Sequence, residues 1–167
     1  MSRLEPVRKL KATDAVESFD CGQVALNQFL QRHALNNQRA NSAQTYVCCD
    51  GEAVVGFYSL TVGSVDHPSA PERVAKGLAR HPVPVMILAR LAVDQSFQGN
   101  GLGRALLKDA LRRTLLAADI AGIRAVLVHA KDDEAREWYR KFDFKEGMTD
   151  PFHLFLVLKD LKQLLGA

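Results

Sequence analysis

A length of 167 residues is enough for one domain with a substantial core and is short for two. Apolar residues make up 47% and charged residues 25%, a composition typical of a soluble globular protein and not of a disordered one. The net charge of +3 is too small to indicate nucleic-acid binding by itself, although it is compatible with an anionic partner.

Neither a membrane segment nor a metal site is expected. The longest apolar runs, such as residues 83–89, are much shorter than a bilayer-spanning helix. The N-terminus lacks the apolar stretch of a secretory signal. The cysteines have no metal-ligand spacing and fit the reducing cytoplasm, where we expect each to be a small buried apolar residue. They are Cys21, Cys48 and Cys49.

The N-terminal part is predicted to contain one strand and two helices. Residues 4–10 can form a short strand, and residues 13–19 a brief helix that Thr13 and Asp14 would cap. A longer helix is expected over residues 23–41, because apolar residues recur there at helical spacing. These residues are Leu26, Phe29, Leu30 and Leu35. The Asn-, Gln- and Arg-rich side of this helix is either a solvated face or a surface that meets substrate.

The next segment is typical of a β-hairpin followed by a short helix. Residues 44–49 and 53–65 have strand-like composition, and the Asp-Gly pair between them is a hairpin turn signal. Gly56 and Gly63 interrupt the second strand, which indicates a bulge or a close approach of another group. An amphipathic helix is expected over residues 72–80, ending before the prolines that precede the next strand.

The middle of the chain passes from a strand through a glycine-rich turn into a helix. The apolar run over residues 86–93 has the length of a buried strand. A helix with one apolar face is expected over residues 101–121. The glycines between them are Gly99, Gly101 and Gly103. This arrangement presents backbone N–H groups and the positive end of a helix dipole to an anion such as a diphosphate.

Two nucleotide-binding motifs with such a turn are excluded. A P-loop needs Gly-Lys-Ser/Thr, whereas Gly103 is followed by Arg104-Ala105. A dinucleotide-binding turn needs the spacing G-x-G-x-x-G and an acidic residue after the next strand. Here the third glycine comes one position early, and the strand-like run over residues 125–128 is followed by His129.

The turn resembles the acetyl-CoA-binding signature of the GNAT N-acetyltransferases. The family pattern Gln/Arg-x-x-Gly-x-Gly/Ala is matched by Gln98, Gly101 and Gly103, and residues 91–94 are similar to the family's fourth strand. The resemblance implies an acetyl-CoA-dependent acyltransferase; the alternative is a glycine-rich turn that binds nothing. The implied acetyl-CoA contacts are Leu91, Ala92, Val93, Gln98, Gly99, Asn100, Gly101, Leu102, Gly103 and Arg104.

The rest of the chain fits the same family. A strand is expected over residues 123–130, a helix capped by the acidic pair 132–133, a last strand over 152–158, and a fraying tail over 159–165. The order of elements resembles the GNAT fold, as a single domain over residues 1–167. That fold is α/β (α+β), with a mixed, mostly antiparallel central sheet, helices on both faces, and strands four and five splayed apart around the thioester.

The resemblance also implies how acetyl transfer is catalysed. The family stabilises the oxyanion with a backbone N–H of the fourth strand, here within residues 91–93. A tyrosine after strand five commonly protonates the leaving thiolate, and Tyr139 stands at that position. The segment 135–144 is similar to the family's Ala-x-x-Phe/Tyr-Tyr-x-x-x-Gly-Phe, except that Asp143 replaces the glycine. The helical spacing of Tyr139 would also suit a core aromatic residue.

The residues near the fourth strand favour an α-amine as the substrate. Enzymes that acetylate lysine often hold a carboxylate base there, but residues 86–93 contain none and Asp94 lies only at their end. A lysine amine, with a pKa of about 10.4, must be deprotonated first, whereas an α-amine, with a pKa of about 7.7–8.0, is already largely or partly neutral at cell pH. His129 is a possible base, although a lone histidine at the end of a buried strand is more often structural.

A closer resemblance is to the acetyltransferase toxins of bacterial toxin–antitoxin modules. It rests on residues 19–30, 90–94, 98–103, 128–130 and 138–139. It implies a cytoplasmic enzyme that acetylates the α-amine of aminoacyl-tRNA and so blocks translation, usually as a homodimer that a ribbon-helix-helix antitoxin neutralises. The candidates for a basic tRNA-binding surface are Lys76, Arg80, Arg90, Arg136, Arg140 and Lys141.

Two other functions are compatible with the sequence. One is an ordinary N-acetyltransferase that acts on a small-molecule amine or a protein N-terminus. The other is a regulatory module that binds CoA without turnover. Acetylation of charged tRNA separates the toxin from both.

Overall fold

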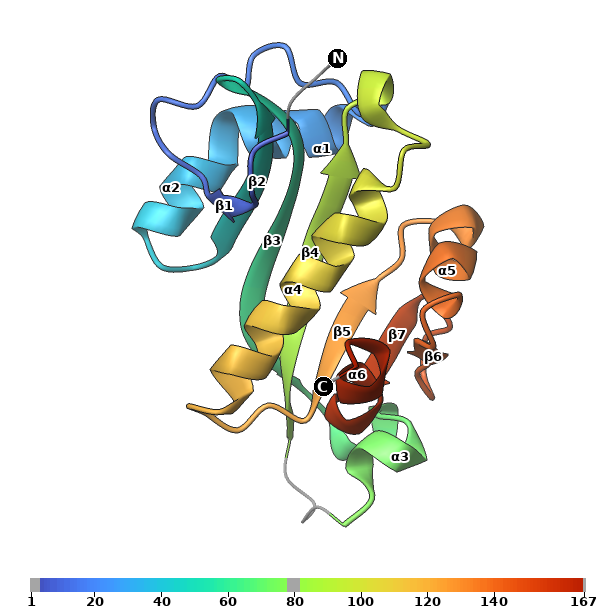
Figure 1. Cartoon of the computed structure of the whole chain (residues 1–167). Helices are drawn as coiled ribbons and strands as arrows, with labels where there is room; N and C mark the ends of the chain where they lie inside the picture. Colours follow the sequence, from blue (N-terminus) through green and yellow to red (C-terminus); the bar gives the residue numbers. More distant parts are fainter. Residues whose placement is uncertain (1–3, 78–81, 167) are drawn as a thin grey trace. The chain divides into compact units, whose positions relative to one another are not determined.

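A computed structural model describes residues 4–77 and 82–166 of the chain. The strands are β1 (Arg8–Lys9), β2 (Gln44–Asp50), β3 (Ala53–Val65), β4 (Val83–Val93), β5 (Ala125–His129), β6 (Lys145–Glu146) and β7 (His153–Val157). Within the described residues they form a seven-stranded sheet in the order β1-β2-β3-β4-β5-β7-β6 (Figure 1). The β4–β5 pair is parallel, and the β1–β2, β2–β3, β5–β7 and β6–β7 pairs are antiparallel. The predicted mixed, mostly antiparallel α/β fold is confirmed.

The helices fill most of the connections between the strands. They are α1 (Val24–Gln28), the π-helical turn η1 (Phe29–His33), α2 (Ala34–Arg39), the 3-10 turns η2 (His67–Ser69) and η3 (Gln95–Phe97), α3 (Glu72–Ala75), α4 (Leu102–Ala118), α5 (Asp133–Arg140) and α6 (Leu158–Leu164). By its contacts the chain divides into two compact units. The first comprises Met1–Thr61 and Ala89–Ala110, and the second Val62–Leu88 and Leu111–Ala167.

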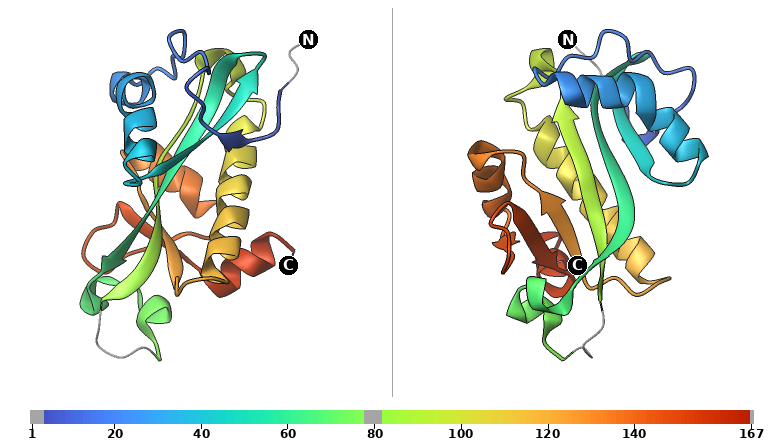
Figure 2. Two further views of the ribbon diagram at one scale, coloured as in Figure 1. Left: turned by 90° about the vertical axis from the view of Figure 1, so that its left-hand side faces the viewer. Right: turned by 180° about the vertical axis from the view of Figure 1, so that it is seen from behind.

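In the first unit, helices cover both faces of β2 and β3. Helices α1 and α2 lie on one side and the first turns of α4 on the other (Figure 2). On the α1 side, Phe57 packs edge-to-face on Phe19 at 5.4 Å and stacks on Phe29 at 6.1 Å between ring centroids. On the α4 side, the Tyr58 hydroxyl donates to Asp109 Oδ2 at 2.5 Å. Adjacent strand residues face opposite ways, so β3 supplies both layers of this core.

Gly56 allows α4 to approach β3. A Cβ atom at this position would lie 2.9 Å from the side chain of Leu106. The close approach predicted for this glycine is therefore confirmed. The bulge is there as well: Cys48 pairs with Gly56 and Cys49 with Val54, so that Val55 of β3 is the extra residue beside this glycine.

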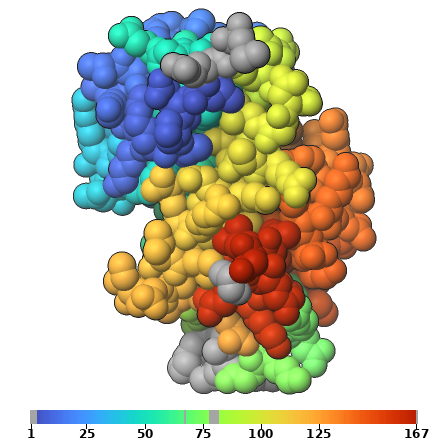
Figure 3. Space-filling view, in the orientation of Figure 1, coloured from blue at the N-terminus to red at the C-terminus, as the bar shows by residue number. Residues whose placement is uncertain are grey.

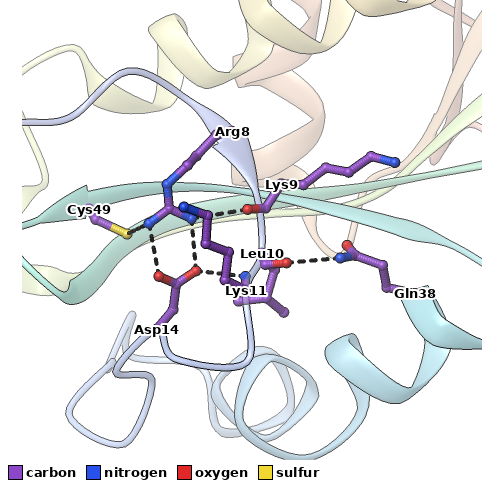
Figure 4. A network of polar contacts seen from close by, with 7 residues as sticks. All are labelled: Arg8, Lys9, Leu10, Lys11, Asp14, Gln38 and Cys49. Atoms are coloured by element: carbon purple, nitrogen blue, oxygen red, sulfur yellow. Dashed lines mark hydrogen bonds and ion pairs between the residues drawn. The ribbon is translucent and has the colours of Figure 1, made fainter.

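The predicted helix over residues 13–19 is wrong, because Asp14 has a different partner. Residues 12–19 form turns and bends instead. The Asp14 carboxylate accepts two hydrogen bonds from the Arg8 guanidinium, at 2.8 and 2.9 Å, and a third from the Lys11 N–H at 2.8 Å (Figure 4). Arg8 belongs to β1. Of the strand expected over residues 4–10, only β1 and an isolated bridge at Leu4 form.

Replacing Asp14 with asparagine should destabilise the protein by about 2 kcal/mol, because Arg8 loses a charge-assisted partner whose side chain is only 5% exposed. Burial alone would raise the pKa of Asp14, but the hydrogen bonds from Arg8 and Lys11 outweigh it and lower that pKa. This stabilisation is complete above the unfolded pKa of about 3.9 and is lost as the pH falls through the lower folded value. Urea unfolding should therefore separate Asp14→Asn from the wild type at neutral pH and much less at acid pH. An equal difference at both would contradict this account.

The second unit has its own core, formed by β4, β5, β7 and α3. Buried side chains of these elements form one cluster, which includes Val74, Val85, Leu127 and Phe155. The β4–β5 ladder ends at the pair Leu88↔Val128, while β4 runs on to Val93.

Two boundaries near β4 differ from the prediction. The strand begins at Val83, so Pro84 lies inside it, with an exposed ring and its carbonyl accepting the Arg124 N–H at 2.9 Å. Helix α3 ends at Ala75, and residues 78–80 of the helix expected over 72–80 lie outside the described part of the chain. A Cβ at Gly63 would meet Ile87 at 2.6 Å, the close approach predicted there.

The C-terminal segment is a packed helix and not the predicted fraying tail. Leu161 of α6 is fully buried, and Asp160 pairs with both terminal nitrogens of Arg73 on α3. In the space-filling view the C-terminal residues form a continuous part of the surface (Figure 3). The short edge strand β6, which the sequence did not indicate, pairs with β7.

Candidate functional site

Asp94 joins the end of β4 to the glycine-rich turn. Its Oδ1 accepts the Ser96 N–H at 3.0 Å and the Ser96 hydroxyl at 2.7 Å, and its Oδ2 accepts the Asp20 N–H at 3.0 Å. Burial alone would raise the pKa of Asp94, but the hydrogen bonds from Ser96 and Asp20 outweigh it and lower the pKa. The carboxylate therefore stays charged and fixes the start of η3.

Gln98 closes the turn through its side-chain amide. Its Nε2 donates to the Val93 carbonyl at 2.8 Å and to the Cys21 carbonyl at 3.1 Å. The loop around Cys21 is attached to η3 at another point, where the Gln95 N–H donates to Asp20 at 2.9 Å. Cys21 is only half-buried, unlike Cys48 and Cys49. The amide of Gln98 thus holds the turn against the N-terminal loop.

Gly99 and Gly101 give the turn its shape. Their φ angles are +82° and +83°, a region that glycine adopts without strain and other residues rarely enter. A Cβ at either position would meet no atom within 4 Å, so the turn borders open space. Helix α4 begins at Leu102, and its first turn contains no acidic residue. Its first N–H groups have no intrahelical acceptor and are free to bind an anion in that space.

The end of β4 lies beside this turn in the first unit. Ala92 is buried in the core cluster with Phe57, whereas Leu91 and Val93 are half-buried and, by strand alternation, face the other way. Asn100 and Arg104 are exposed, while Leu102 is buried and anchors the helix start. All ten residues predicted to contact acetyl-CoA therefore lie in this unit, between residues 91 and 104.

Tyr139 lies in the second unit, on α5. The Asp132 carboxylate caps this helix by accepting the Ala135 N–H at 2.8 Å, so Asp132 is the capping residue of the predicted acidic pair. The Tyr139 side chain is 9% exposed and packs edge-to-face on Trp138 and Phe144, with centroids at 5.0 and 5.4 Å. Burial raises the pKa of Tyr139, which keeps its phenol protonated at neutral pH.

His129, expected as a lone histidine at the end of a buried strand, has a second histidine beside it. It is exposed and stacks on His153, its register partner on β7, at 4.1 Å between ring centroids. His153 in turn pairs with Asp150 at 3.4 Å. Burial, with a smaller effect of His153, lowers the pKa of His129 and favours its neutral form. The pairing of β5 with β7 creates this contact, which the sequence order does not reveal.

Two of the basic candidates are arginines placed on aromatic rings. The Arg90 guanidinium lies 3.8 Å from the ring centroid of Phe29 in the first unit. In the second unit, Arg136 lies 4.9 Å from the Phe152 ring and pairs with Asp133 at 3.2 Å. The Nε of Arg136 is buried and has no partner among the described residues.

The other basic candidates differ in how far their charge is compensated. Arg140 pairs with both Glu137 and Glu146, at 3.3 and 3.1 Å, which reduces its suitability for a phosphate. Lys76 and Lys141 are exposed. Arg80 lies outside the described residues.

In residues 4–77 and 82–166, no group of three or more His, Cys, Asp or Glu side chains is arranged to hold a metal ion. No helix within that part of the chain is long and apolar enough to cross a bilayer.

A mixed sheet whose fourth strand leads through a glycine-rich turn into a long helix is the arrangement expected of the GNAT acetyltransferases. The acetyltransferase (GNAT) domain matches residues 41–146, and the chain belongs to this family. The predicted family and acyltransferase activity are thereby confirmed.

The chain is also similar to more specific relatives. It is 46% identical over 166 residues to a tRNA-acetylating toxin of Mycobacterium tuberculosis, covering 99% of each chain. Among solved structures, AtaT complexed with acetyl-methionyl-tRNAfMet matches with a TM-score of 0.90 and 27% identity, over 97% of this chain and 99% of the other. A mutant AtaT toxin bound to acetyl-CoA and the C-terminus of the antitoxin AtaR matches with a TM-score of 0.84 and 27% identity, over 98% and 99%.

Proposed function

We propose that this protein is a toxin that transfers the acetyl group of acetyl-CoA to the α-amine of aminoacyl-tRNA and so blocks translation. The observation that carries the proposal is the turn from Gln98 to Arg104, which is shaped for a diphosphate at the start of α4. Further support comes from the relative named a tRNA-acetylating toxin, which matches over nearly the whole chain. A similar solved structure contains acetyl-methionyl-tRNAfMet.

The first unit supplies the binding of acetyl-CoA in this proposal. Backbone N–H groups at Gly99, Gly101, Gly103 and Arg104 would hold the diphosphate, because the space beside the turn is open and no carboxylate belongs to the first helical turn. The edge of β4 over residues 91–93 would lie along the pantetheine arm. One of its N–H groups would stabilise the oxyanion.

Acetyl transfer then requires one proton donor at the thioester. Acetyl-CoA supplies an activated acyl group whose carbonyl carbon is attacked by the amine nitrogen. As the new C–N bond forms and the C–S bond breaks, the Tyr139 hydroxyl gives its proton to the departing sulfur. A phenol is already protonated at neutral pH, and burial, which raises the pKa of Tyr139 further, keeps this proton in place. The excess proton on nitrogen passes to water.

The substrate amine needs little help from a base. An α-amine near pKa 8 is partly neutral already, and residues 86–93 carry no carboxylate. His129 is the alternative proton acceptor, because its lowered pKa keeps one ring nitrogen unprotonated.

The proposal extends to the partners and the organisation of the protein. Acting on aminoacyl-tRNA, the enzyme would work in the cytoplasm, as a homodimer and as a single domain over residues 1–167. The favoured tRNA contacts are Lys76 and Lys141, which are exposed, and Arg90, which has no ion pair among the described residues. Arg136, paired with Asp133, is less favoured, and Arg140, with two glutamate partners, is the least favoured. A ribbon-helix-helix antitoxin would neutralise the enzyme, since a similar toxin was solved bound to the antitoxin AtaR.

The purified enzyme should move label from acetyl-CoA onto charged tRNA but not onto uncharged tRNA. The KM for charged tRNA should rise steeply with salt, because each neutralised phosphate releases condensed counterions. Turnover at saturating tRNA should change much less. Filter-bound label over a salt series measures both quantities.

The alternatives give different results in the same assay. Label on free amines or peptides but never on charged tRNA would indicate an ordinary N-acetyltransferase. Binding of acetyl-CoA without release of free thiol, with any acceptor, would indicate a regulatory module.

A further inference from the structure

Arg90 is a half-buried cation that has no ion pair in the described part of the chain. It lies on β4, directly before the segment assigned to acetyl-CoA, and its guanidinium rests on the Phe29 ring at 3.8 Å. Within residues 4–77 and 82–166 it forms neither an ion pair nor a side-chain hydrogen bond. Burial lowers the pKa of Arg90, yet an arginine remains charged in a protein. The charge is thus kept partly out of water with only an aromatic ring beside it.

Phe29 stands at the start of an irregular helix. The chain passes from α1 to α2 through the π-helical turn Phe29–His33, and such turns are frequent at functional sites. The Phe29 ring is 4% exposed and stacks on Phe57, with 19° between the ring planes. The ring is therefore a fixed platform within the core of the first unit.

Stacking leaves the donors of Arg90 available. A guanidinium that lies over a ring uses its face for the cation–π contact, while its N–H groups remain in the plane of the group. That planar set of donors matches the oxygens of a phosphate in a two-point contact. Because Phe29 limits the positions of the side chain, less conformational entropy is lost when the anion binds.

We propose that Phe29, held in the core by its stacking on Phe57, is a positioning residue that holds Arg90 for a phosphodiester of the tRNA substrate. The inference rests on the proposed function, because it assigns a phosphate contact of that same substrate. It adds Phe29, an uncharged residue of the core, to the residues on which tRNA binding is proposed to depend.

The test compares Phe29→Leu, Arg90→Gln and the double variant in steady-state acetylation of charged tRNA. Phe29→Leu should raise the KM for charged tRNA about three- to tenfold, the range expected for a partly desolvated cation–π contact. Arg90→Gln should raise it at least as much and flatten the slope of log KM against log salt by about 1. In the Arg90→Gln background, Phe29→Leu should have no further effect. The KM for acetyl-CoA and the turnover at saturation should stay near wild type in all variants.

A matched control separates positioning from a looser core. Phe19 is a buried ring of the same cluster that packs on Phe57, and Arg90 does not lie on it. Phe19→Leu should lower the urea midpoint and leave the KM for charged tRNA unchanged. Phe29→Met, which also removes the ring but fills more of its space, replaces Phe29→Leu if that variant does not fold.

Three results would overturn the inference. In the first, Phe29→Leu raises the KM for charged tRNA by the same factor in the wild type and in Arg90→Gln. In the second, Phe19→Leu raises this KM as much as Phe29→Leu does. In the third, Phe29→Leu raises only the KM for acetyl-CoA. In each case wild-type acetylation of charged tRNA would still stand. Failure of the proposed function itself would appear earlier, as a wild-type enzyme that never labels charged tRNA.

Discussion

Replacing Tyr139 with phenylalanine is expected to lower turnover by about two to four orders of magnitude, the usual contribution of a general acid. The substitution removes one oxygen and keeps the ring that packs on Trp138 and Phe144, so the fold should be preserved. Without the phenol, the thiolate must leave unprotonated or take its proton from water. The measurement is single-turnover acetylation of charged tRNA, which isolates the chemical step from product release.

Two controls make the Tyr139 result interpretable. Urea unfolding should give a midpoint close to wild type, because little packing is lost. Calorimetry should give an unchanged affinity for acetyl-CoA, because the residues that we propose to bind it lie on β4 and the glycine-rich turn and not on α5. Near-normal turnover by a folded Tyr139→Phe variant would show that the residue is a core aromatic and that another group protonates the thiolate.

Introducing aspartate at Gly101 is expected to weaken acetyl-CoA binding by about two orders of magnitude or more. The change forces a side chain onto a backbone with φ of +83°, which costs about 1 kcal/mol or more, and places a negative charge beside the diphosphate. Since nothing lies within 4 Å of the added Cβ, the protein should still fold. Calorimetric titration with acetyl-CoA measures the loss.

Two further variants divide the Gly101 effect into its parts. Gly101→Asn has nearly the same shape without the charge, so it should retain more affinity than Gly101→Asp. Gly122→Asp places the same charge at another glycine with open surroundings, in the second unit, and should bind acetyl-CoA normally. Wild-type affinity in Gly101→Asp would contradict the assignment of the turn.

The elements that the sequence predicted well carry strong local signals. The strand over residues 53–65 coincides with β3, because β-forming residues predominate there after an Asp-Gly turn, despite two glycines. The helix after the glycine turn and the helix of Tyr139 also form, each with a clear start signal. Two elements with weaker signals were wrong. Asp14 pairs with Arg8 instead of capping a helix, and residues 158–164 form a helix because Leu161 finds a core to pack on.

The candidate site was predictable only where it is local in sequence. The spacing of Gln98, Gly101 and Gly103 identified the turn, but no pattern showed that the amide of Gln98 is bonded to Cys21. The sequence also could not show that Arg140 has two glutamate partners, while Arg90 has no acidic partner among the residues that the structure describes. Such differences arise from the tertiary fold, which decides which side chains meet.

The bond from Gln98 to Cys21, with those between Asp20 and the segment of Asp94 and Gln95, joins two distant parts of the chain. During evolution these segments are therefore constrained together. An insertion in the N-terminal loop would move the carbonyl that holds Gln98, even though every residue of the glycine motif stayed the same. Recombinants that exchange N-terminal segments between relatives would have to keep this loop at its original length.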